Sequence, residues 1–198
     1  MIQIIKKNNS QPYLDFMRYY NNAVSADQKN IEAISISSYN NNTAEVQSRF
    51  VNLKYINDDE WIFFSNYESP KSNDFEDHPQ ISALFYWQNI DTQIRIKAHI
   101  SKTNQNFSDL HFDNRDRKKN ALAISSKQSM KIDSYEDIKN NFLEVYNSES
   151  ELKRPNYWGG FSFTPYYFEF WKGHKDRLNK RKTYTYIHEE WKKNYLQP

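Results

Sequence analysis

The chain has 198 residues, 27 basic and 25 acidic, so its formal net charge of +2 gives no overall field for binding nucleic acid or a membrane surface. It has no cysteine, which excludes disulfides, zinc–thiolate sites and thiol nucleophiles. No apolar run reaches the length of a signal peptide or a membrane span, and we expect a cytoplasmic protein.

Aromatic residues must form most of the core. The chain has 13 Phe, 15 Tyr and 5 Trp, whereas its mean hydropathy is only −1.01. Large aromatic surfaces can supply the burial that the few aliphatic side chains do not. The length predicts one domain over residues 1–198, with residues 1–9 flexible, or one protomer whose burial is completed by a second copy.

The first half of the chain mixes one clear helix with several short strands. Ser10 can cap a helix that runs to about Val24, in which Leu14, Met17 and Tyr20 recur at helical spacing. The elements expected next are a strand at Ile31–Ser38, its hairpin partner at Glu45–Ile56, a strand at Trp61–Asn66, a helix at Ser69–His78 and a strand at Ile81–Trp87.

The most regular alternation of the chain lies at Gln93–Ser101. One face would carry Ile94, Ile96, Ala98 and Ile100, and the other Gln93, Arg95, Lys97 and His99. Because successive side chains of a strand point to opposite faces, this pattern predicts a half-exposed antiparallel strand.

The second half begins with a charged segment, residues 106–127, in which we expect one or two short helices. Ser134 resembles the first residue of a capping box, and we expect a helix from there to Tyr146. Closing strands are expected at Phe161–Thr164, Tyr166–Trp171 and Thr183–Ile187. Seven or eight short strands without regular strand–helix alternation favour a mainly β (α+β) fold, an antiparallel barrel with a few peripheral helices.

All three glycines lie between residues 155 and 181, the stretch around which the chain is organised. Gly159, Gly160 and Gly173 indicate backbone positions that a side chain cannot fill, although two turns between strands would also explain them. The same stretch contains an aromatic block followed by Arg177 and Arg181, which could hold an anion. This combination is typical of a ligand-binding wall.

The remaining motifs exclude several chemistries. The five histidines show no metal-ligand spacing, and the chain lacks a nucleophile elbow and the glycine-rich phosphate and dinucleotide loops. We therefore expect no metal site. Arg49, Lys54, Lys71 and the pair Gln128–Ser129 stand near the ends of expected strands or helices, where such groups are suited to a phosphate.

Ordered motifs along nearly the whole chain resemble the pyridoxamine 5'-phosphate oxidase family of FMN-dependent enzymes. The motifs that carry the resemblance are Arg49–Lys54, Phe64–Lys71, Leu84–Trp87, Gln93–Arg95, Ser126–Ser129, Trp158–Phe161 and Glu169–Trp171. The resemblance implies a split β-barrel homodimer in which each FMN lies at the subunit interface and is held by both chains.

The resemblance also implies a role for individual residues. It assigns FMN contacts to Arg49, Phe50, Val51, Asn52, Phe64, Ser65, Lys71, Gln93, Gln128, Ser129, Trp171 and Arg181. It assigns the phosphate of a small anionic ring substrate to Lys54, His111, Arg115 and Lys119, and its reacting end to Arg177 and Asn179. The implied reaction is oxidation of pyridoxamine or pyridoxine 5'-phosphate to pyridoxal 5'-phosphate, with O2 as acceptor.

Several positions depart from the family pattern, mostly on the substrate side. Asn179 replaces a histidine, Lys180 an aspartate, His111 a tyrosine, Lys119 a serine and Pro70 an arginine. The resemblance also implies an N-terminal arm that covers the substrate, and we expect this protein to lack it. FMN binding is therefore the firmer expectation, and a related oxidase for another, phenazine-like ring or a catalytically weak flavin-binding protein stays open.

A third alternative is a nucleic-acid-binding module, because basic and aromatic residues interleave near the C-terminus. The basic residues concerned are Lys172, Lys175, Arg177, Lys180, Arg181 and Lys182. An anion-lined flavin cleft explains the same run, and we expect no nucleic-acid partner.

Overall fold

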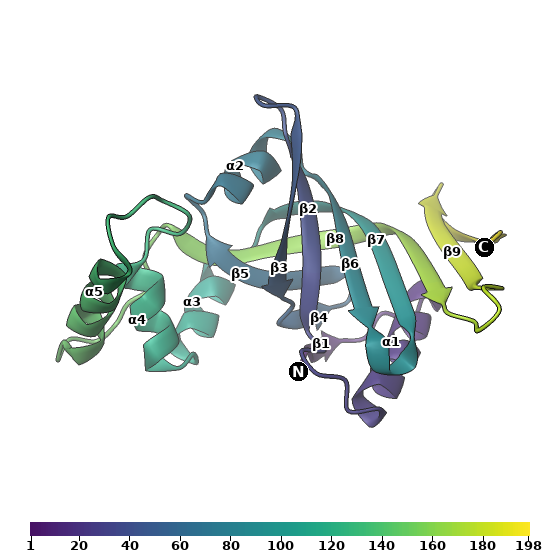
Figure 1. Ribbon diagram of the computed structural model, residues 1–198, viewed down its shortest axis with the longest axis horizontal. Coiled ribbons are helices and arrows are strands. Elements are labelled where there is room, and N and C mark those ends of the chain that lie inside the picture. The colour runs from purple at the N-terminus through teal and green to yellow at the C-terminus, as the bar shows by residue number, and fades with distance from the viewer.

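Ten strands form one sheet that organises the molecule, and the computed structural model describes residues 1–198 (Figure 1). The strands are β1 (Gln3–Lys6), β2 (Ala33–Asn40), β3 (Glu45–Asn52), β4 (Tyr55–Asn57), β5 (Glu60–Asn66), β6 (Gln80–Trp87), β7 (Thr92–Lys102), β8 (Trp158–Lys172), β9 (Lys180–Ile187) and β10 (Glu190–Leu196). The helices are α1 (Gln11–Ser25), α2 (Pro70–Asp77), α3 (Gln105–Asp113), α4 (Arg117–Ser125) and α5 (Tyr135–Asn147), with a 3₁₀ turn η1 (Gln88–Ile90).

The sheet is mixed and does not close on itself. Its main path runs β1-β4-β5-β8-β7-β6-β2-β3, and β9 joins β8 to β10. Every pair is antiparallel except β1 with β4. The expected mainly antiparallel split barrel is therefore confirmed, with one parallel pair at its edge.

The start of the chain differs from the expectation of flexibility for residues 1–9. Gln3–Lys6 pairs with β4, Ile2 is buried, and the backbone N–H of Ile2 donates to the hydroxyl of Tyr20 at 3.0 Å. The strand has only four residues, too few to show an alternating pattern, and pairing with β4 is what orders it.

Strand β8 is one continuous strand rather than the two expected around Pro165. Proline lacks a backbone N–H and is tolerated in sheets mainly at edges and bulges. The register confirms this rule, because Lys97 faces Tyr167 whereas Ala98 faces Pro165, which leaves Tyr166 as the extra residue of a bulge. The strand bends there and continues.

The core is aromatic, as the composition predicts. Phe16 of α1 lies 4.4 Å from Trp61 between ring centroids, and Tyr13 lies 5.3 Å from Phe168. The alternation expected for β7 is also confirmed, because its isoleucines at 94, 96 and 100 are buried and the residues between them are mostly exposed. These contacts fasten α1 to one face of the sheet.

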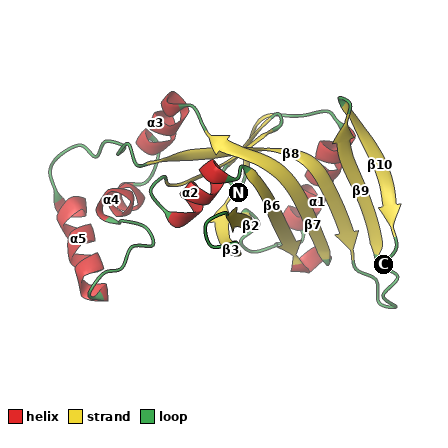
Figure 2. Ribbon diagram, turned by 90° about the horizontal axis from the view of Figure 1, so that it is seen from above, coloured by secondary structure: helices red, strands yellow, loops and turns green.

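Most of the helices lie at one end of the sheet, whereas α1 packs against one of its faces (Figure 2). Helices α3, α4 and α5 lie together at one end, and the β9–β10 hairpin lies at the other. The expected cap is confirmed, because the Ser134 hydroxyl accepts from the backbone N–H of Asp137 at 3.1 Å. None of the helices is both long and apolar enough to span a bilayer.

The glycines are needed for close approach, not for turns. Gly159 and Gly160 lie inside β8, and no glycine has a positive φ angle. A Cβ atom at Gly160 would lie 2.6 Å from Thr103 Oγ1 and 3.1 Å from the ring of Phe64. A Cβ atom at Gly159 or Gly173 would collide with Tyr67 or Asp91.

Gly160→Ala should therefore destabilise the protein by about 1–3 kcal/mol, because the added methyl group forces Thr103 and the ring of Phe64 to move. Urea unfolding followed by tryptophan fluorescence would measure the change. Thr164→Ala, at an exposed position of the same strand, is the control and should stay within ~0.5 kcal/mol of the wild type. Equal effects of the two substitutions would contradict this explanation.

Candidate functional site

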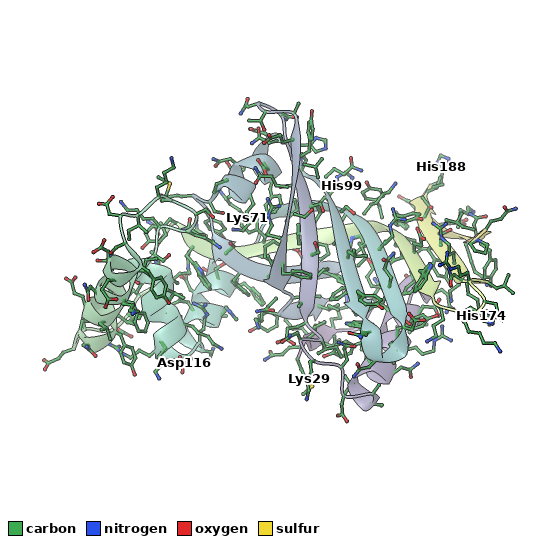
Figure 3. The ribbon with its side chains drawn as sticks, in the orientation of Figure 1. Lys29, Lys71, His99, Asp116, His174 and His188 are labelled. Carbon is green, nitrogen blue, oxygen red and sulfur yellow. The ribbon has the colours of Figure 1, made fainter.

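A cleft of about 490 Å³ opens between the sheet and the helical end of the molecule. Lys71, the second residue of α2, lines this cleft, and Figure 3 labels its place in the molecule. The lining side chains come from β3 and the turn after it, from β5, α2, α3, the loops after α3 and α4, and the first residue of β8: Gln47, Arg49, Phe50, Val51, Asn52, Lys54, Phe64, Ser65, Pro70, Lys71, His111, Arg115, Gln128, Ser129 and Trp158.

The lining carries positive charge without a carboxylate. Arg49, Lys54, Lys71 and Arg115 face the cleft, and no Asp or Glu lines it. Lys119 lines an adjoining hollow of about 240 Å³ that shares Arg115 with the cleft. Such an excess of cations in a concave site favours an anionic ligand.

Lys71 is the most unusual of these cations because it is only 6% exposed. Its ammonium group donates to Ser69 Oγ at 2.9 Å and to Gln128 Oε1 at 3.2 Å, and it forms no salt bridge. Burial, with a smaller contribution from the charge of Arg49, lowers the pKa of Lys71 to about 8. Because burying an unpaired charge is costly, a buried ammonium group without a carboxylate favours the binding of an anion beside it.

The guanidinium of Arg49 is held in place by two neighbouring polar residues. Its guanidinium donates to Ser38 Oγ at 2.8 Å and lies 4.0 Å from the buried carboxylate of Asp74, which accepts from the same serine hydroxyl at 2.6 Å. Burial lowers the pKa of Arg49. These contacts aim the guanidinium at the cleft before any ligand arrives.

The loop after α4 brings two further polar side chains to the cleft. Gln128 Oε1 accepts from Ser65 Oγ at 3.0 Å as well as from Lys71, so its amide is fixed. Ser129 adopts a left-handed backbone with φ of 68°, which costs energy for a residue with a side chain. Strained residues of this kind cluster at ligand-binding loops.

An aromatic wall closes the other side of the cleft. The imidazole of His111 stacks on Phe64 with centroids 3.7 Å apart and planes at 10°, and Trp158 is parallel to Phe64 at 5.4 Å. The guanidinium of Arg115 lies 4.8 Å from the centroid of Trp158. These planes form a flat surface for a ring next to cations that suit its anionic group.

His111 is neutral at physiological pH. Burial first, and then the charges of Arg115, Lys54 and Lys119, lower its pKa to about 4. Its Nδ1 lies 2.8 Å from the hydroxyl of Tyr55. With the tyrosine as donor, the imidazole proton sits on Nε2, so His111 offers an uncharged hydrogen bond.

Six of the residues assigned by the resemblance do not line this cleft: Lys119 lines the adjoining hollow, and the other five lie farther along the sheet. Gln93 faces Trp171 across β7 and β8, and Trp171 faces Arg181 across β8 and β9, so these three form one row. Arg177 and Asn179 lie in the loop between β8 and β9. Figure 3 shows His174 of this loop at the right-hand edge of the molecule and Lys71 near the middle, far from it.

Strand β8 accounts for the separation. It has 15 residues, and at ~3.3 Å per residue it is about 45 Å long. Trp158 at its start lines the cleft, whereas Trp171 lies near its end. One chain therefore brings the assigned residues together in two groups, which we call the cleft group and the β8–β9 group.

Asn179 has a contact inside its own loop. Its Oδ1 accepts from the backbone N–H of His174 at 3.1 Å, and the backbone N–H of Arg177 donates to the carbonyl of His174 at 2.9 Å. Arg177 has a φ of 61°, again a left-handed backbone. Asn179 thus shapes the turn that presents Arg177.

Comparison with known proteins now adds to this geometry. Residues 158–198 match the family model described as the pyridoxine 5'-phosphate oxidase C-terminal dimerisation region. The pyridoxine/pyridoxamine 5'-phosphate oxidase of Rippkaea orientalis is 31% identical over 193 residues, which cover 96% of this chain and 91% of that protein. The chain belongs to the pyridoxine/pyridoxamine 5'-phosphate oxidase family.

Two further relatives show the range of this family. Pyridoxine/pyridoxamine 5'-phosphate oxidase 1, chloroplastic, of Arabidopsis thaliana is 32% identical over 89% of this chain, which spans about a third (34%) of the length of that relative. PhzG from Burkholderia lata 383, solved in complex with tetrahydrophenazine-1-carboxylic acid, superposes with a TM-score of 0.91 at 25% identity and covers 96% of this chain and 93% of that one.

The structure adds residues to the oxidase-family site that the sequence motifs do not single out. Gln47 lines the cleft, Tyr55 bonds to His111, and Ser38 orients Arg49. Trp158, the first residue of one motif, lines the cleft without having been assigned a role. Tyr55 directly follows the motif Arg49–Lys54, but Ser38 lies on another strand and can be assigned only once β2 is known to pair with β3. No group of three or more His, Asp or Glu side chains could hold a metal ion.

Lys71→Met should remove most of the stabilisation that inorganic phosphate gives to the ligand-free protein. At about ten times its Kd, phosphate should stabilise the wild type by ~1.4 kcal/mol, measured by thermal unfolding with and without phosphate. Without phosphate the variant should be as stable as the wild type or more so, because a buried, unpaired ammonium group is removed. Lys7→Met, at an exposed lysine, is the control. Full retention of the phosphate effect in Lys71→Met would contradict the assignment.

Proposed function

We propose that this protein is an FMN-dependent oxidase that converts pyridoxamine or pyridoxine 5'-phosphate to pyridoxal 5'-phosphate with O2 as electron acceptor. The observation that carries the proposal is the buried ammonium group of Lys71, which has no carboxylate partner and faces a cleft of cations and stacked aromatic rings. Membership of the oxidase family agrees with it.

The cleft group fits the phosphate end of FMN. Arg49 and Lys71 would neutralise the phosphate, Ser129 and Gln128 would add hydrogen bonds, and all four side chains line the same cleft. Pro70 also lines it, where the family has an arginine, so this chain would hold the phosphate with one cation fewer at that point.

A second copy of the chain would complete the site. Gln93, Trp171 and Arg181 lie too far along the sheet to reach the cleft of their own chain. In a twofold symmetric dimer the same surface of each protomer meets its partner, so the β8–β9 group of one chain can enter the cleft of the other, twice. The match of residues 158–198 to a dimerisation region supports this arrangement.

The substrate would lie between the flavin and the helical end of the cleft. Lys54, Arg115 and Lys119 would bind its phosphate through charge, and His111 would donate a neutral hydrogen bond. FMN held by these residues would supply the redox chemistry, a two-electron oxidation of the carbon that bears the amine or alcohol, with O2 reduced to hydrogen peroxide. A primary alcohol gives the aldehyde directly, and an amine gives an imine that water hydrolyses to the aldehyde and ammonia.

The protein's own contribution is orientation. Arg177 of the partner protomer would hold the reacting end of the substrate, and its guanidinium stays protonated, so it orients and does not act as a base. The left-handed turn at Arg177 and the contact between Asn179 and His174 fix the loop that presents this arginine.

Purified protein supplied with FMN should release hydrogen peroxide with pyridoxamine or pyridoxine 5'-phosphate. The shared site is tested by mixing Arg49→Ala and Arg181→Ala subunits, each of which damages both sites of its own dimer. Random re-pairing yields one intact site in every mixed dimer, so about one quarter of the wild-type activity should return. No recovery after verified subunit exchange would exclude a site built from both chains, and no peroxide from the wild type would exclude the activity.

A second candidate is a related oxidase acting on another anionic ring. Two observations favour it. The residues that depart from the family pattern lie mainly on the substrate side, and the fold superposes on PhzG, which was solved in complex with tetrahydrophenazine-1-carboxylic acid. If the same departures from the family pattern removed most of the turnover, the protein would be a catalytically weak flavin-binding protein.

The two candidates differ in their response to restoring the family residues. If the substrate is a vitamin B6 phosphate, the double variant His111→Tyr, Asn179→His should oxidise it about tenfold faster or more, because the lost contacts return. Steady-state kcat/KM with pyridoxine 5'-phosphate checks this. An unchanged or lower value would favour the second candidate, with Lys175→Gln, an exposed lysine of the same loop, as the control.

A further inference from the structure

A buried carboxylate on β8 lies behind Arg181. Glu169 is 2% exposed, and both of its oxygens are occupied. Oε1 accepts from Nε and Nη2 of Arg181 at 2.8 and 2.7 Å, and Oε2 accepts from Nη1 of Arg95 and the hydroxyl of Tyr167, each at 3.1 Å. The carboxylate thus bonds to two arginines and needs no further partner.

The sheet dictates this arrangement. Glu169 faces Arg95 on β7 and Thr183 on β9, and Arg181 lies two residues from Thr183 on the same face of β9. A carboxylate between two arginines offsets their mutual repulsion and removes the freedom of both long side chains.

The guanidinium of Arg181 has five N–H groups, and three of them are used within the protomer. Two bind Glu169, and Nη1 donates to the backbone carbonyl of Gln197 at 3.1 Å. One N–H on each terminal nitrogen remains for a ligand. The orientation of these two N–H groups is set by Glu169 on one side and by the C-terminal segment on the other.

We propose that Glu169 is the positioning residue for Arg181 and thereby for the FMN that Arg181 contacts. The inference rests on the proposed function. It assigns to Glu169 no contact with FMN or substrate. Its effect is to hold the guanidinium of Arg181 in one direction, so that less freedom is lost when FMN binds.

The charge of Glu169 and its positioning role have opposite effects on FMN. A carboxylate near an anion-binding arginine weakens anion binding by simple electrostatics, so neutralising it would tighten FMN binding if charge were all that mattered. If the direction of the guanidinium matters more, neutralising Glu169 releases Arg181 and weakens binding. The sign of the change separates the two explanations.

The experiment is the Kd of FMN for the ligand-free dimer, measured by quenching of flavin fluorescence, for the wild type and for Glu169→Gln. We expect binding to weaken about tenfold, because Arg181 loses its charge-assisted partner. Glu190→Gln is the matched control, since it removes one negative charge from an exposed ion pair of the neighbouring strand β10. Unchanged or tighter binding in Glu169→Gln would overturn the proposal.

A double-mutant cycle shows whether the effect passes through Arg181. Arg181→Ala should weaken FMN binding by itself, and adding Glu169→Gln to it should have no further effect on the Kd. An equal loss in both backgrounds would indicate a general disturbance of the sheet and would overturn the positioning role.

Failures of the two proposals look different. Wild-type protein that binds no FMN refutes the proposed function, whereas FMN binding that Glu169→Gln leaves intact refutes only the role of Glu169. If Glu169→Gln does not fold, Glu169→Asp keeps the charge but draws the carboxylate back by one methylene group. It should also weaken FMN binding, and wild-type affinity in Glu169→Asp would count against the proposal.

Discussion

Strand β8 determines the geometry of the molecule because three neighbours share its two edges. Along one edge it pairs with β7, and along the other it pairs first with β5 and then with β9. The bulge at Tyr166 falls between the β5 and β9 segments and lets one strand serve both. Trp158 at its start lines the cleft and Trp171 near its end belongs to the β8–β9 group, so the length of this one strand sets the spacing of the two groups.

The sequence predicts the parts of this fold in which one local pattern decides the outcome. The alternation in β7, the serine cap at Ser134 and the aromatic core are all found as expected. Strands β1 and β10 are not predicted, because they are short or mostly exposed and depend on a neighbouring strand. The single strand expected over Glu45–Ile56 is wrong at its end, because β3 stops at Asn52 and Tyr55–Asn57 forms the separate strand β4. The break expected at Pro165 is wrong because a bulge accommodates the proline.

The candidate site, like the fold, is only partly predictable from the sequence. Motifs predict Arg49, Lys71 and Gln128 near element ends, whereas the structure places Arg49 inside β3, and burial and partners come only from tertiary structure. Nothing in the sequence indicates that Lys71 lacks a carboxylate, or that Asn179 bonds to the backbone of its own loop. Of the basic residues near the C-terminus, Arg181 bonds to Glu169 and Lys182 to Asp15, so part of that charge is balanced within the chain.

The low pKa of Lys71 has a thermodynamic consequence for ligand exchange. Near pH 8 about half of the ligand-free molecules carry a neutral amine at this position. A phosphate group favours the ammonium form, so its binding draws a proton from solvent, and its release returns one. Binding of a phosphate group at this cleft is thereby linked to proton uptake, and mild alkalinity shifts the balance toward the ligand-free protein.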